Sequence, residues 1–278
     1  NRYFYFTSNG TIILNGTSDV LANFATPGSA TGGTRFTNNS NIYLNGQSSV
    51  GIMLNPLVSN FGNSQMLLNS PIEISGDKSV GVQLTNKNFK LENSKINLNL
   101  GTTGNVTDST GNITGNNPNL VEGAVGVLVS SAGSAFILKD YKINIGAHSL
   151  NNAGIRVATG SVTLDTNGVN SSVNFSAGSE KSAGVSITGA TSSATLAGAT
   201  ININGSYNVG VQVENNGTLN YSKGLIDVNG TGNSGITNLS ATTNMNNSLA
   251  AISVGLKGTG VYNAGTFNMT GGSITANN

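Results

Sequence analysis

The sequence contains no cysteine and no tryptophan, and only 8% of its residues are charged. Without cysteine the chain can form neither disulfides nor thiolate metal sites, and cysteine catalysis is excluded. The 12 Lys and Arg nearly balance the 11 Asp and Glu, and they are scattered along the chain. No basic stripe is therefore available for nucleic acid, and no polybasic patch for a membrane surface.

Long apolar runs and helix signals are also missing. No run approaches the roughly 18 apolar residues of a transmembrane helix, and the N-terminus lacks a signal-peptide pattern. Since the first residue is Asn1, we expect the sequence to be a piece of a longer protein. The 38 glycines and the many asparagines disfavour helices. Apolar residues recur at period 2, which indicates short strands and argues against disorder.

One phrase recurs along the chain. It consists of an alternating apolar strand, a polar turn with glycine, and a second alternating strand after a further glycine. The clearest copies are residues 42–54, 72–84 and 201–213. Self-similarity at a fixed period is typical of a solenoid.

The glycine after the turn marks each copy, and Leu21 replaces it in an early copy at residues 12–21. We expect this marker glycine to adopt a positive φ at a corner or to lie where a Cβ has no room. Successive markers are 30, 45, 28, 30, 26, 25 and 25 residues apart. Residues 101–120 are a polar insertion of 20, and 45 minus 20 gives the basic unit of about 25. The markers are Gly51, Gly81, Gly126, Gly154, Gly184, Gly210, Gly235 and Gly260.

Each unit contains three short alternating segments, for example 211–213, 219–221 and 226–228. The pattern predicts an all-β fold, a right-handed parallel β-helix of about nine coils of roughly 25 residues with three short strands per coil. Residues 1–278 would form a single segment of this β-helix. Strands of successive coils would pair about 4.8 Å apart, and Ile42, Ile72 and Ile201 would line one interior wall.

The outward positions of one strand share a chemical character. Four of them in succession are asparagine, which predicts a stacked amide ladder along the axis. The residues at this address are Tyr43, Glu73, Asn97, Asn144, Asn174, Asn202, Asp227 and Ser253.

Residues 208–221 and 260–275 resemble the passenger repeats of large type V (type Va) autotransporter adhesins, and are most similar to those of fusobacterial outer-membrane autotransporters. The resemblance implies a β-helix on the bacterial cell surface, exported through an outer-membrane barrel. It implies partners such as a host cell-surface protein or glycan, or another bacterium. Membrane contact would come only through a C-terminal barrel that this sequence does not include, and we expect a monomer.

Three departures from the repeat are candidate binding loops. Segments 25–37 and 55–65 leave the same corner of adjacent coils, so we expect them to lie side by side. They contribute Arg35, Phe36, Leu57 and Phe61, an aromatic and cationic mixture typical of recognition surfaces. The insertion at 101–120 leaves a different corner and contributes Asp108 and Asn112. The alternative is that these loops are solvent-exposed decorations without a partner.

Catalytic chemistry is not indicated. Glycoside hydrolysis needs two carboxyl groups roughly 5–9.5 Å apart, whereas Glu73 and Asp227 share an outward address several coils apart. His148 lies in a turn without catalytic or metal-binding partners. Residues 230–235 match G-x-G-x-x-G, but no helix follows, so the match is the repeat turn. We expect no catalytic residue, no cofactor and no metal.

Three functions remain open from the sequence. The first is an adhesin passenger fragment that attaches to host cells or other bacteria through its loops and faces. The second is a passive structural stalk of a longer surface fibre. The third, a polysaccharide-active β-helix enzyme, lacks a constellation of residues to support it.

Overall fold

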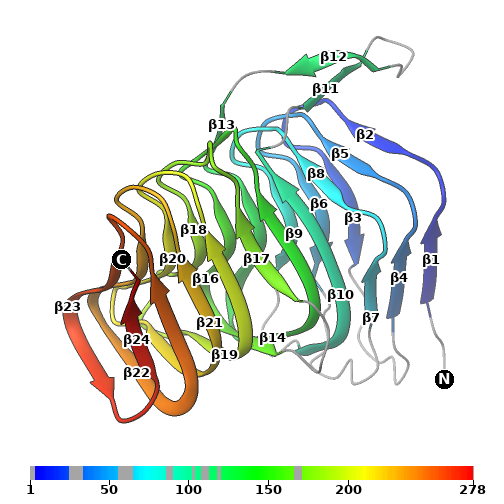
Figure 1. Cartoon of the computed structure of the whole chain (residues 1–278). Coiled ribbons are helices and arrows are strands. Elements are labelled where there is room, and N and C mark those ends of the chain that lie inside the picture. Colours follow the sequence, from blue (N-terminus) through cyan, green and yellow to red (C-terminus); the bar gives the residue numbers. More distant parts are fainter. Residues whose placement is uncertain are drawn as a thin grey trace.

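The structure is a computed structural model that describes residues 4–24, 34–55, 65–85, 90–101, 104–107, 113–117, 120–165 and 171–277. Within these ranges every regular element is a β-strand, and there is no helix that could cross a membrane. Parallel strands form a β-solenoid of about eight turns. The coils stack along one axis, with the two termini at opposite ends (Figure 1). The predicted all-β parallel solenoid is confirmed.

Each coil has three sides, which we number in chain order. The first side begins with β1 (Phe4–Ser8), β4 (Thr34–Asn38) and β7 (Gln65–Leu68). The second side includes β2 (Ile12–Leu14), β5 (Ile42–Leu44), β8 (Ile72–Ile74), β17 (Ser172–Phe175) and β24 (Ser273–Ala276). The third side includes β3 (Val20–Phe24), β6 (Val50–Leu54), β9 (Val80–Leu84), β18 (Ala183–Ile187) and β20 (Val209–Glu214).

In later coils the strands continue around corners, so the predicted short segments merge. Three strands run from the first side to the second: β10 (Lys90–Leu100), β19 (Ser192–Ile203) and β21 (Thr218–Val228). Two run from the third side to the first: β16 (Ala153–Asp165) and β23 (Thr259–Met269). Two visit all three sides: β14 (Val125–Ile145) and β22 (Ser234–Val254). Nine strands stack on the third side, from β3 to β23, so eight steps separate the first from the last.

The second side builds the predicted interior wall. Ile42 pairs with Ile72, and the same column reaches Ile201 four coils after Ile72. All three side chains are fully buried. Burial of such stacked Ile, Leu and Val side chains supplies the main driving force for folding, since each contributes about 1.5–3 kcal/mol. The column consists of Ile12, Ile42, Ile72, Leu98, Ile143, Val173, Ile201, Ile226, Ile252 and Ile274.

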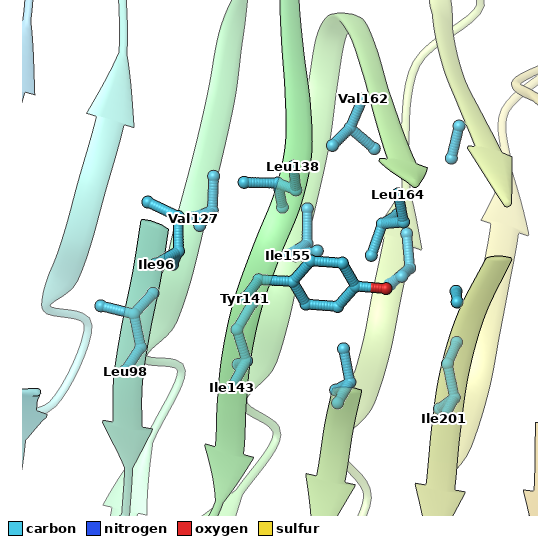
Figure 2. Packing of buried hydrophobic residues seen from close by; sticks show 14 of the residues in the cluster. Ile96, Leu98, Val127, Leu138, Tyr141, Ile143, Ile155, Val162, Leu164 and Ile201 are labelled. Carbon is cyan, nitrogen blue, oxygen red and sulfur yellow. The ribbon is translucent and has the colours of Figure 1, made fainter. Parts of the chain in front are cut away.

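The interior is filled by side chains from all three sides. Figure 2 shows the ring of Tyr141 crossing the core between Leu138, Ile155 and Leu164, with Ile143 next to it on the same strand. Tyr141 is completely buried. The core is therefore a packed column and not a channel.

The marker glycines form a second column on the third side. Glycine is required there because the next coil leaves no space for a Cβ atom. A Cβ on Gly184 would lie 2.7 Å from the carbonyl oxygen of Gly210, and a Cβ on Gly210 would lie 2.6 Å from that of Gly235. None of the eight marker glycines is among the residues with positive φ. Of the two reasons offered from the sequence, the close approach of the next coil is the correct one.

The amide ladder is present on the outer surface of the second side, with one change of residue. Asn99, and not Asn97, stands next to Asn144; Asn97 pairs with Lys142. The Nδ2 of each asparagine donates to the side-chain Oδ1 of the asparagine one coil before it. The first asparagine, Asn99, donates to Glu73 Oε1 instead. The distances are 2.7 Å for Asn99 to Glu73, 2.7 Å for Asn144 to Asn99, 3.1 Å for Asn174 to Asn144 and 2.8 Å for Asn202 to Asn174.

The 101–120 insertion forms an antiparallel hairpin of β11 (Gly104–Thr107) and β12 (Ile113–Asn117). It projects away from the solenoid at the corner between the second and third sides, next to the short strand β13 (Val121–Glu122), which pairs with β15 (Ser149–Leu150) (Figure 1). The strands that flank segments 25–37 and 55–65 are β3, β4, β6 and β7, so both segments leave the corner between the third and first sides.

Candidate functional site

The corner between the second and third sides carries the most regular exposed feature of the molecule. In every coil the residue of this turn that stands three positions before the marker glycine, or before Leu21 in the first coil, has a positive φ. We call this column the αL ridge. Its members are Ser18, Ser48, Lys78, Gly123, Asn151, Lys181, Tyr207, Gly232 and Lys257.

Hydrogen bonds between coils explain the left-handed backbone of the ridge. The N–H of Lys181 donates to the carbonyl oxygen of Ser206 (3.2 Å), and the N–H of Tyr207 donates to that of Thr231 (3.0 Å). The N–H of Gly232 in turn donates to the carbonyl oxygen of Lys257 (3.1 Å). The ridge residue thus continues the parallel ladder through the turn, and side chains on it point along one exposed edge.

Buried polar side chains hold the turn from inside. In five coils the residue after the ridge residue has a side chain that accepts the N–H of its counterpart in the preceding coil; these residues are Ser79, Asn152, Ser182, Asn208 and Asn233. Asn208 Oδ1 accepts from the N–H of Ser182 (2.8 Å), and Asn233 Oδ1 accepts from the N–H of Asn208 (2.8 Å). Since a buried N–H without an acceptor would cost about 1–3 kcal/mol, these side chains fix the turn geometry.

Tyr207 is the one large aromatic residue on the ridge, and its ring rests on the next coil. A Cβ on Gly232 would lie 2.7 Å from Cδ1 and 2.8 Å from Cε1 of Tyr207. The ring therefore occupies the space that the missing side chain of Gly232 leaves free. Tyr207 nevertheless stays 60% exposed.

Charges divide along this corner. In the earlier coils Asp77 Oδ1 accepts from the N–H of Glu122 (2.9 Å), and Glu122 Oε1 accepts from Asn151 Nδ2 (3.1 Å). In the later coils, turn residues 204–208, 229–233 and 255–258 contain no acidic residue. The turns from Tyr207 to Lys257 therefore carry only cationic or uncharged side chains, whereas Glu180, next to Lys181, pairs with Ser206.

Of the six residues predicted for binding loops, the structure describes two. Arg35 lies on β4 and is exposed. Phe36 also lies on β4, but it is only 2% exposed and packs edge-on against Phe24 at a ring distance of 5.5 Å. The strand begins at Thr34, so segment 25–37 was drawn too long, and the assignment of Phe36 to an exposed recognition loop is wrong. Leu57, Phe61, Asp108 and Asn112 lie outside the described residues.

The carboxylates that the enzyme hypothesis would use do not converge. Glu73 and Asp227 are separated by five steps of the second-side ladder, on the order of 24 Å. Sequence reasoning missed that Asp77 and Glu122 occupy adjacent coils, since the insertion separates them by 45 residues. Both carboxylates accept hydrogen bonds from amide groups of the next coil, which gives them a structural role. In the described ranges, no group of three or more His, Asp and Glu residues is placed to hold a metal ion.

The outer surface of the third side is a further polar region. Arg156 and Gln212 belong to one outward column, with Ser186 between them. Burial lowers the pKa of the Arg156 guanidinium, and the charge of Glu214 partly offsets this. Gln212 Nε2 donates to Glu214 Oε1. Gln212 and Glu214 are hydrogen-bonded to each other, and all three side chains are half-buried, so they offer a ligand less than the ridge does.

Comparison with known proteins gives little. No family model matches the chain, and no curated protein does. Among solved structures, the crystal structure of a TibC-catalysed, hyper-glycosylated TibA fragment is 12% identical with a TM-score of 0.17; the alignment covers 100% of this chain and 98% of that one. A likeness this low carries no argument, so the function has to be argued from the chain itself.

Proposed function

We propose that this chain is part of a cell-surface adhesin, a passenger segment of the autotransporter type that attaches to host cells or to other bacteria. The repeats that resemble fusobacterial passengers suggest this, and the solenoid fold is compatible with it. In such a protein the core is repetitive and the exposed corners carry recognition.

The observation that carries the proposal is the position of the irregular features. The hairpin of β11 and β12 and the αL ridge share one corner, while segments 25–37 and 55–65 leave another. The remaining outer surface is made of regular ladders such as Asn99 to Asn202. Decoration gathered along edges of a rigid rod suits contact with another surface.

The test is attachment of the purified chain to epithelial cells and to bacterial cells, with three deletion variants. These replace 25–33, 56–64 or 104–117 with a short Gly-Asn turn, which leaves the flanking strands intact. Attachment that falls with at least one deletion supports the proposal. Attachment that is absent in the full chain, or that no deletion lowers, argues against binding through these loops.

A passive stalk is the second candidate, and the uninterrupted ladders favour it. The second-side column continues through every described coil, and the marker glycines continue without a gap from Gly51 to Gly260. Such a rod resists bending because each coil is hydrogen-bonded to both neighbours. A chain that binds neither cells nor glycans and keeps its extended shape in solution scattering would favour this function.

The chain is proposed to lie outside the bacterial cell and to act without enzymatic activity. Release of reducing ends or unsaturated products from a polysaccharide panel would contradict the second part of this proposal. In that case Asp77 and Glu122 would be the first carboxylates to replace, since they lie in adjacent coils.

A further inference from the structure

The exposure of Tyr207 is a feature of the fold and not of a chain end. The coils on both sides of it are present, because Lys181 pairs with the coil of Tyr207 and Tyr207 pairs with the coil of Gly232. The Cδ1–Cε1 edge of the ring lies against Gly232, and the residue remains 60% exposed. The ring is thus held in place with the rest of its surface open to solvent.

The backbone at this position makes the residue type unusual. Tyr207 has a φ of 57°, in a region that glycine and asparagine adopt readily and a bulky side chain rarely does. Its exposed ring gains little burial in return. The turn imposes the same backbone on Lys78, Lys181 and Lys257, and at Tyr207 it fixes the direction in which the side chain leaves the turn.

Polar and cationic groups surround the ring along the ridge. Lys181 is one coil before Tyr207, and Lys257 is two coils after it, so the two ammonium-bearing residues are three ladder steps or roughly 14 Å apart. Ser206 and Thr231, which pair with each other beside the ridge, supply hydroxyl groups. No acidic residue lies in the turns of Tyr207, Gly232 or Lys257.

We propose that the ridge from Lys181 through Tyr207 and Gly232 to Lys257 binds a linear acidic glycan that runs along the solenoid axis. This deepens the proposed adhesin function and rests on it. A sugar ring has an apolar C–H face and polar edges, so its face packs on the Tyr207 ring while Ser206 and Thr231 meet its hydroxyls. Carboxylate or sulfate groups of neighbouring sugars meet Lys181 and Lys257.

An acidic peptide is the rival ligand for a cationic edge. It would need lysines but not an open aromatic ring. The exposed ring and the two flanking hydroxyl groups therefore favour the glycan.

Binding is tested by titrating the chain with uronate-containing, sialylated and sulfated oligosaccharides, with neutral oligosaccharides of the same length and with an Asp/Glu-rich peptide. Tyr207→Asn removes the ring but keeps a residue that tolerates the left-handed backbone, so the turn is preserved. A second variant combines Lys181→Gln with Lys257→Gln. Lys78→Gln is the matched control, an exposed lysine with the same backbone three coils before Lys181.

We expect at least one acidic oligosaccharide to bind, with affinity at least tenfold lower for Tyr207→Asn and unchanged for Lys78→Gln. The double lysine variant should bind more weakly and lose most of the salt dependence. The site is overturned if no acidic oligosaccharide binds, if Tyr207→Asn binds as well as the parent, or if Lys78→Gln loses as much. Binding of the acidic peptide with the same dependence on Tyr207 would overturn the glycan in favour of a protein partner.

Cell attachment of the same variants separates this site from the proposed function. If the parent and Tyr207→Asn attach equally and no glycan binds, the ridge site fails and the adhesin function stands. If a glycan binds through Tyr207 and no cell or bacterium is attached, the site stands and the adhesin function fails.

Discussion

The ring of Tyr207 fills the space above Gly232, where a Cβ would lie 2.7 Å from the ring atom Cδ1. These residues are 25 apart in the sequence and belong to adjacent coils. Their fit depends on the ladder register and on the identity of both residues. This contact holds the exposed ring of Tyr207 in place on the ridge.

Replacing Gly232 with alanine should displace this ring. Gly123→Ala is the matched control, since Gly123 has the same ridge position and a Cβ there would meet only Lys78 Cγ, at 3.6 Å. Both variants carry an alanine with positive φ, which costs about 1–2 kcal/mol. We expect Gly232→Ala to lose a further 1 kcal/mol or so in chemical unfolding. Equal losses in the two variants would mean that the ring is not seated on Gly232.

Alanine at a marker glycine should destabilise the solenoid more than alanine at an open glycine. At Gly184 the Cβ would lie 2.7 Å from a backbone oxygen of the next coil, whereas at Gly10 no atom lies within 4 Å. We expect Gly184→Ala to cost about 1–3 kcal/mol, as overpacking does, and Gly10→Ala to change stability by less than about 0.5 kcal/mol. Thermal unfolding by circular dichroism measures both, and a tolerant Gly184 would contradict the close approach of the coils.

The periodicity of the sequence was sufficient to predict the fold, because apolar residues such as Ile42, Ile72 and Ile201 recur at the same position of successive repeats. It was not sufficient for the register within β10. Ile96, Leu98 and Leu100 alternate without interruption, so either of two asparagines could have continued the ladder, and the pairing of Leu98 with Ile72 and Ile143 places Asn99 there. Alternation alone cannot resolve a shift of two residues, because such a shift keeps the same face inside.

The ridge was missed for a different reason. Lys, Ser and Tyr carry no signal for a left-handed backbone, and only Gly123, Gly232 and Asn151 of its members do. The usable signal was positional, since each ridge residue stands three places before the marker position. Phe36 was misjudged because an aromatic next to Arg35 fits a recognition loop and an inward strand position equally well.

The amide ladder should couple its members energetically. Asn174 Nδ2 donates to Asn144 Oδ1, and Asn174 Oδ1 accepts from Asn202 Nδ2. We expect Asn174→Ala to cost about 1–2 kcal/mol, and a double-mutant cycle with Asn144→Ala to give a coupling of about 0.5–1 kcal/mol. The control cycle pairs Asn174 with Asn244, which belongs to a different ladder on the first side. If both cycles are additive, the ladder contributes no coupling.

The two buried tyrosines should respond oppositely to loss of their hydroxyl groups. Tyr221 Oη lies 2.8 Å from the carbonyl oxygen of Gly224 and accepts the N–H of Ala251 at 3.1 Å. The buried hydroxyl of Tyr141 has no hydrogen-bond partner among the described residues. We expect Tyr221→Phe to lose about 1–2 kcal/mol and Tyr141→Phe to be neutral or stabilising. Urea unfolding of the two variants checks this, and a loss for Tyr141→Phe would reveal a partner.

Stability should also fall at alkaline pH. Burial raises the pKa of Tyr221 to about 12, against the lowering effect of its backbone hydrogen bonds, and burial with the charge of Asp165 raises the pKa of Tyr141 further. The unfolded chain releases these protons near pH 10 while the folded chain keeps them, so unfolding is favoured as pH rises from about 10 to 12. The slope is at most about 1.4 kcal/mol per pH unit for each tyrosine. Tyr221→Phe should flatten the profile, and an unchanged slope would contradict the burial.

The central claim is that parallel stacking in this register brings residues of successive coils side by side, and the absence of cysteine permits a direct test. Asn99→Cys with Asn144→Cys places two thiols on paired residues, about 4.8 Å apart between Cα atoms, which suits a disulfide. The measurement is the free-thiol content after mild oxidation, compared with Asn97→Cys plus Asn144→Cys. We expect the first pair to close and the second to stay reduced. Closure of the second pair alone, or of neither, would contradict the register on which the ridge and its proposed glycan site are built.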